Sequence, residues 1–263
     1  MRTGIFKNLL RHEQVILLLS LLAMTAMAWV YLIHLSQGIG NPGSDVGNLE
    51  MSMPQMHSWV FVDFILMFVM WTVMMVAMMV PATAPMLLLY SNVTRRRKQR
   101  GQSHVPTSIF LLGYVLLWTG FSVLATFANW GLHINSMLSS MMGESTNPIL
   151  GGGLLIAAGL FQWTSLKTAC LKKCRSPLTF IMDEWRNDHA GVLCMGLKHG
   201  IYCLGCCWAL MSLLFVLGVM NLSWIAGLSA LVMLEKIAPM GIWISRMIGI
   251  GLICWGALIL RSI

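Results

Sequence analysis

Six of the seven cysteines in this chain lie between residues 170 and 207. Cys170 and Cys174 are four residues apart, and Cys203, Cys206 and Cys207 form a C-x₂-C-C pattern. Residues three or four apart share one face of a helix, so each group can present its sulfurs together. Thiolate sulfur is a soft ligand that suits Cu(I) or Zn. These five cysteines are therefore a candidate metal site, and the alternative is that they are small packing residues.

A second set of soft donors lies in the short segment 51–57, whose sequence is MSMPQMH. Met51, Met53 and Met56 supply thioethers, and His57 supplies an imidazole. The proline within the segment bends it, so these four side chains can surround one ion without help from the fold. Uncharged soft donors favour Cu(I). The segment is a candidate for Cu(I) capture, and the alternative is an accidental cluster in a chain with 23 methionines.

A third set of donors follows helical spacing. Asp63, Met67, Met70, Met74 and Met78 are four, three, four and four residues apart. They fall on one stripe about 22 Å long at about 1.5 Å per residue. Thioethers on such a stripe can pass Cu(I) along, although Met also fills irregular helix contacts. An acid inside a membrane span is costly, so Asp63 is a functional candidate unless it reaches water at the end of the span.

Adjacent opposite charges occur at Glu235 and Lys236, near the inner end of an apolar run. Charged side chains within a membrane are costly and tend to be paired. Either these two pair with each other, or each reaches separately to the membrane surface.

The elements that must position these residues are apolar helices. Hydrophobic residues make up 57% of the chain and charged residues 10%, with a mean hydropathy of +0.76, whereas soluble domains are about 25% charged. Apolar runs near the ~20 residues that cross a bilayer recur throughout. The sequence predicts an all-α, polytopic transmembrane bundle that forms a single domain over residues 1–263. About seven spans are expected, near 15–34, 59–89, 108–130, 149–166, 202–219, 223–238 and 242–260.

Lys and Arg are concentrated in two of the connections between these runs. Segments 35–58 and 131–148 contain neither residue, whereas 91–107 contains five and 167–200 contains six. The positive-inside rule makes the basic connections and the N-terminus cytoplasmic. The predicted location is the bacterial inner membrane, with the cysteines on the reducing side, where disulfides are rare. The net charge of +8 then reflects topology and anionic lipid, and nucleic acid is not an expected partner.

Several strings in the chain resemble one known bacterial family. They are MWTVMMVAMMVPATAPM at 70–86, LKTACLKKCRSP at 166–177, GIYCLGCCWALM at 200–211, MNLSWIA at 220–226 and EKIAP at 235–239. In this order they are similar to the domain of unknown function 2182, whose members are described as predicted metal-binding integral membrane proteins. The resemblance covers roughly residues 60–240, implies no particular reaction, and singles out the same five cysteines. Asp63 and the segment 51–57 lie at or beyond its edge.

The leading hypothesis is a non-enzymatic membrane protein that handles copper. The methionines and His57 of segment 51–57 would collect Cu(I) outside, Asp63 and the methionine stripe would guide it, and the cysteines would receive it. The first rival is a membrane enzyme, or an accessory subunit of a copper-dependent oxidase, with Asp63, His57, His34 and His133 as an oxygen and nitrogen site. The second rival is a structural or assembly subunit that binds no metal. The expected partners are the lipid bilayer and the metal ion, with other membrane proteins as candidates.

Overall fold

The computed structural model describes residues 2–40, 61–135 and 147–262, which form α-helices joined by turns and contain no strand. The predicted all-α fold is confirmed. The described helices are α1 (Arg2–Gly40), α3 (Phe61–Gln99), α4 (Thr107–Ile134), α5 (Pro148–Phe161), α6 (Ser165–Arg175), α7 (Pro177–Glu184), α8 (His189–Ser212), α9 (Leu214–Leu217), α10 (Leu222–Ile237) and α11 (Gly241–Arg261).

Five of the described helical segments are long and apolar enough to cross a membrane. These are Gln14–Gln37, Phe61–Gln99, Thr107–Ile134, His189–Leu217 and Gly241–Arg261. Helices α5 and α6, which meet at a bend of 63°, make a sixth if they form one broken span. Helix α10 coincides with the expected span at 223–238, but its 16 residues fall short of the ~20 that cross the hydrocarbon. The count of seven spans and the cytoplasmic N-terminus stay predictions.

Side-chain caps begin the helices that carry the cysteines. The side chain of Thr164 accepts a hydrogen bond from the backbone N–H of Lys167 at the start of α6. Asp188 does the same for the N–H of Gly191 at the start of α8. Each cap satisfies a backbone donor that has no partner within the helix. The caps thus fix where each helix begins, and with it the face on which its cysteines lie.

Helices α4 and α8 approach each other closely through glycine. A Cβ atom added at Gly196 of α8 would collide with the carbonyl oxygen of Phe110 on α4, and one added at Gly200 would lie 2.7 Å from Leu117. Absence of side chains at these positions lets the two backbones touch. These two glycines therefore hold the first half of α4 against α8, just before the C-x₂-C-C cysteines of α8.

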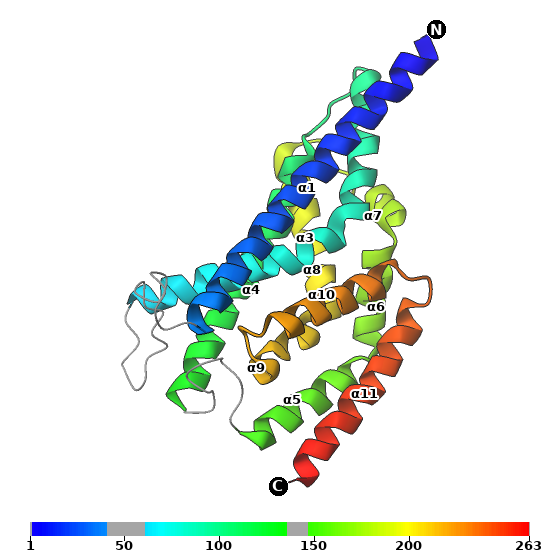
Figure 1. The fold of residues 1–263 in the computed structure, drawn as a ribbon. Helices are drawn as coiled ribbons and strands as arrows, with labels where there is room; N and C mark the ends of the chain where they lie inside the picture. Colours follow the sequence, from blue (N-terminus) through cyan, green and yellow to red (C-terminus); the bar gives the residue numbers. More distant parts are fainter. Residues whose placement is uncertain (1, 41–60, 136–146, 263) are drawn as a thin grey trace.

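Helix α3 runs through the core and changes direction along its length, as its internal Pro81 and Pro85 predict (Figure 1). The four methionines of the predicted stripe are at most 5% exposed and belong to the main hydrophobic core. The stripe therefore faces the protein interior and not lipid.

The two basic connections lie together at one end of the molecule. Arg97, at the end of α3, donates a hydrogen bond of 2.9 Å to Asn187 and lies 5.0 Å from the ring centre of Trp185, both just before α8. The N-terminus is at this end and the C-terminus is at the other (Figure 1). This arrangement agrees with a topology in which both basic connections and the N-terminus share one side of the membrane.

Candidate metal centre

Cysteines of α6 and α8 meet inside the bundle. Cys203, Cys206 and Cys207 are at most 1% exposed, and the thiol of Cys174 lies near enough to interact with those of Cys203 and Cys206. Cys170 is partly buried, and its sulfur is 2.7 Å from where a Cβ atom at Gly205 of α8 would lie. The structure thus brings all five cysteines singled out by the sequence to the interface of α6 and α8.

Cys203 has the most polar surroundings in this cluster. The ammonium nitrogen of Lys236, on α10, donates a hydrogen bond of 2.9 Å to its sulfur. The hydroxyl of Tyr114, on α4, lies 3.0 Å from the same sulfur and donates to the carbonyl of Met79 at 3.0 Å. Lys236 is 8% exposed and Tyr114 1%. Thiolate is the metal-binding form of Cys, and Lys236 supplies the counter-charge that a buried thiolate needs.

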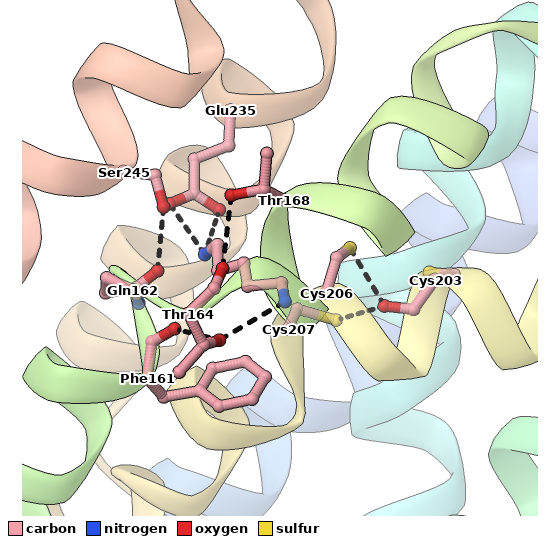
Figure 2. Close-up of polar contacts among 10 residues, drawn as sticks. Phe161, Gln162, Thr164, Thr168, Cys203, Cys206, Cys207, Glu235 and Ser245 are labelled. Atoms are coloured by element: carbon pink, nitrogen blue, oxygen red, sulfur yellow. Dashed lines mark hydrogen bonds and ion pairs between the residues drawn. The ribbon is translucent and has the colours of Figure 1, made fainter.

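The other two thiols of α8 point back along their own helix. Cys206 and Cys207 each donate a hydrogen bond of 3.0 Å to the carbonyl oxygen of Cys203 (Figure 2). Within the described ranges, no three His, Cys, Asp or Glu side chains are already placed to hold a metal ion together. A shared ion would require these thiols to rotate about χ1 away from the carbonyl, a change between staggered rotamers.

A buried ion pair lies beside the cluster. The ammonium of Lys167, on α6, is 2.8 and 3.0 Å from the two carboxylate oxygens of Glu235, and both side chains are 1% exposed. Next to it, Ser245 donates to the side-chain oxygen of Gln162 at 2.9 Å (Figure 2). Neither arrangement expected for Glu235 and Lys236 is found, because both are buried and each has a different partner. The pair links α6 to α10 and so fixes Lys236 over Cys203.

His199 is a candidate that the sequence reasoning missed. It lies one turn before Cys203 on α8, it is 2% exposed, and its Nδ1 atom has no hydrogen-bond partner. Its ring packs against Phe110, Tyr114 and Phe180, at centroid distances of 5.9, 5.9 and 5.4 Å. The sequence does contain a signal for His199, because it is four residues from Cys203, the same helical spacing that relates Cys170 to Cys174.

A cavity of about 230 Å³ adjoins the cluster. Among its lining residues are Cys174, His199 and Lys236, and its wall also includes Arg175 and Pro177, where α6 gives way to α7. The cavity therefore extends from Cys174, at the edge of the thiol cluster, to the part of the molecule that carries the basic connection between α5 and α8.

The other predicted site residues do not join this cluster. Met51, Met53, Met56 and His57 lie outside the described residues. Asp63 is partly buried at the start of α3, about 24 Å along the helix from Met79 at ~1.5 Å per residue. The ring of Phe64 is 5.7 Å from that of Trp130, which places the start of α3 against the end of α4. Asp63 and His133 therefore lie at the same end of this helix pair.

The inner end of the methionine stripe comes close to the thiols. Met78 is the last residue of the stripe, and the carbonyl of the next residue, Met79, accepts the hydrogen bond of Tyr114. The same hydroxyl contacts the sulfur of Cys203. One phenol group therefore lies between the backbone of α3 and the cysteines of α8.

A model of the PpoB2 family, described as copper chaperone, matches residues 68–259, which is well over half of the chain. The chain belongs to this family. The match to PpoB2 includes the cysteine cluster, Tyr114, His199 and Lys236, and it leaves out Asp63 and segment 51–57. It covers much of the range that resembles the domain of unknown function 2182. No curated protein and no solved structure matches the chain.

Proposed function

We propose that this PpoB2 protein is a multi-pass copper chaperone of the bacterial inner membrane that holds Cu(I) within the cluster of Cys174, Cys203, Cys206 and Cys207, with two of these thiols bound to the ion as thiolates. The observation that carries the proposal is the gathering of four thiols from two helices beside the buried ammonium of Lys236. The copper chaperone description of the family supports the identity of the metal.

Charge balance favours Cu(I) in this place. One Cu(I) ion bound by two thiolates carries a net charge of −1, which the ammonium of Lys236 neutralises. A Zn²⁺ ion on four thiolates would carry −2 and leave one charge uncompensated. Because uncompensated charge in a buried site is costly, the single adjacent ammonium matches a monovalent soft ion.

The methionines complete the proposed path. Segment 51–57 would collect Cu(I) on the outer side, and Asp63 with the buried stripe on α3 would lead it toward Tyr114 and Cys203. Thiolates bind Cu(I) more tightly than thioethers do, so the downhill direction is toward the cysteines. The burial of the stripe and its approach to Tyr114 support this route.

Removal of the thiols tests the proposal. Cys203→Ser, Cys206→Ser and Cys207→Ser combined should weaken Cu(I) binding by more than about 100-fold, beyond the ~10–100-fold typical of residues that only support a metal ligand. The measurement is a competition titration against a chromophoric Cu(I) chelator, with protein purified in mild detergent. The control is Cys194→Ser with Cys254→Ser, since both residues are exposed. Wild-type affinity in the triple variant would contradict the proposal.

The oxidase-type rival retains one supporting observation, the location of Asp63 and His133 at the same end of α3 and α4. In that function, loss of His57, His34 and His133 would abolish copper binding, and loss of the cysteines would not. The structural rival predicts that purified protein contains no copper by elemental analysis. The cysteine titration and the elemental analysis together separate all three functions.

A further inference from the structure

The face of α8 that carries Cys203 continues to His199. Side chains four residues apart on a helix have Cβ atoms about 5–6 Å apart. Two ligands at this spacing can hold one metal ion, as the two histidines of an H-E-x-x-H helix do. His199 and Cys203 have this spacing, and Cys174 from α6 already lies near Cys203. Two helices therefore bring three soft or borderline donors into one region, where side-chain rotation would let all three reach one ion.

The imidazole of His199 is held in place but is incompletely satisfied. Rings of α4 and α7 pack around it, whereas its buried Nδ1 has no hydrogen-bond partner. A buried polar atom without a partner reduces stability, so such an atom calls for an explanation. A few other described side chains have similar atoms, but His199 is the one of them that lines the cavity.

The cavity offers space for an ion to reach these donors. Its volume of about 230 Å³ exceeds the ~30 Å³ share of one water molecule several times over. Cys174 and His199 both line it, and its wall at Arg175 and Pro177 belongs to the connection predicted to be cytoplasmic. Ile237 also lines the cavity and is 56% exposed, so it marks where the cavity reaches the protein surface.

We propose that His199 is a ligand of the Cu(I) ion, together with Cys203 and Cys174, and that the ion moves between this site and the predicted cytoplasmic side through the cavity. The inference rests on the proposed function, since it adds a nitrogen ligand and an access route to the thiol site. A neutral imidazole adds no charge, so a set of one nitrogen and two thiolates keeps the balance with Lys236.

The ligand set is tested by copper X-ray absorption on wild-type protein loaded with one equivalent of Cu(I). The expected spectrum contains one nitrogen scatterer near the ~2.0 Å typical of metal–histidine bonds, with sulfur near ~2.3 Å. His199→Gln should lose the nitrogen scatterer, which a merely supporting residue would leave in place, and should bind Cu(I) at least about 10-fold more weakly. The control His189→Ala removes an exposed histidine at the start of the same helix and should change neither.

The wild-type spectrum decides the matter even if the variant does not fold. A shell of sulfur alone would overturn the ligand role of His199. If the thiol variants lose Cu(I) while His199→Gln keeps both affinity and spectrum, this inference fails and the proposed function stands. If the thiol variants also keep Cu(I), the proposed function itself fails. Addition of free imidazole to His199→Ala should restore the nitrogen scatterer.

The access route has a separate kinetic test. Ile237→Trp should narrow the cavity where it reaches the protein surface and so slow Cu(I) loading, as measured by stopped-flow mixing. The Cu(I) affinity at equilibrium should stay unchanged. Leu234→Trp is the matched control, because Leu234 is 55% exposed on the same helix and does not line the cavity. Equal loading rates in Ile237→Trp and wild type would overturn the route.

Discussion

Lys236 distinguishes the thiol cluster from an ordinary contact between helices. An apolar interface can accommodate small cysteines without any charge nearby. Here a lysine is taken out of water and directed at one sulfur, at 2.9 Å. Burial of an ammonium is costly unless an anion compensates it, so its presence indicates a site that carries negative charge. The adjacent Glu235 does not provide that charge, because Lys167 already pairs with it.

Substitution of Lys236 tests this role. We expect Lys236→Met, which keeps an unbranched side chain but removes the charge, to weaken Cu(I) binding at least ~10-fold, in the range seen when groups that support metal ligands are lost. Lys236→Arg should retain most of the affinity. Chelator competition gives the affinities, and Lys198→Met is the control, since Lys198 is half exposed and pairs with Glu184. Unchanged affinity in Lys236→Met would remove the charge-balance argument.

At the scale of elements, α8 does most to build the site. Glycines place it against α4, so Tyr114 reaches Cys203, while its contact with α6 brings in Cys174. Its residues 195, 199, 203, 207 and 211 repeat every four positions and are Met, His, Cys, Cys and Met, all buried. Because four residues exceed the 3.6 of one turn, this row of donors winds gradually around α8 over about 24 Å, and His199, Cys203 and Cys207 are its central members.

The methionine stripe on α3 can be separated from packing by substitution. Met70→Leu, Met74→Leu and Met78→Leu keep the apolar volume, so each should cost less than ~1.5 kcal/mol of stability. If thioethers conduct the ion, Cu(I) transfer into proteoliposomes that contain an entrapped Cu(I) indicator should fall at least ~10-fold. The control changes Met182, Met240 and Met247 to Leu, all more than 60% exposed. Equal Cu(I) transfer in both triple variants would show that the methionine stripe serves packing alone.

At the scale of the molecule, the outer helices present apolar side chains to their surroundings. Only 17% of the most apolar window of α1, and the same share of α11, is buried inside the protein. Such faces suit lipid. The basic connections at one end of the molecule then define the predicted cytoplasmic surface, on which the cavity beside the thiols would open.

This orientation has a direct test by single-cysteine labelling in a cysteine-free background. Asp45→Cys should react with an impermeant reagent from outside the cell, because segment 35–58 contains no Lys or Arg. Lys98→Cys, in the basic connection after α3, should react only after permeabilisation. The opposite result would reverse every side assignment, including the direction of the copper path.

Local spacing in the sequence determined much of this protein. Apolar runs separated by polar turns required helices, and the i, i+3 and i+4 positions of Cys203, Cys206 and Cys207 required one shared face, since both follow from the 3.6-residue period. Neither of these inferences depends on which helix packs against which.

Tertiary structure alone decided what surrounds the thiols. Tyr114 is 89 residues from Cys203 in sequence, and Lys236 is 33 residues away. No local pattern relates such positions, because helix pairing depends on how side-chain surfaces fit and on which buried charges must be compensated. For the same reason Glu235 pairs with Lys167 instead of its neighbour, and His199, whose one local signal is its spacing from Cys203, comes to line the cavity beside the thiols.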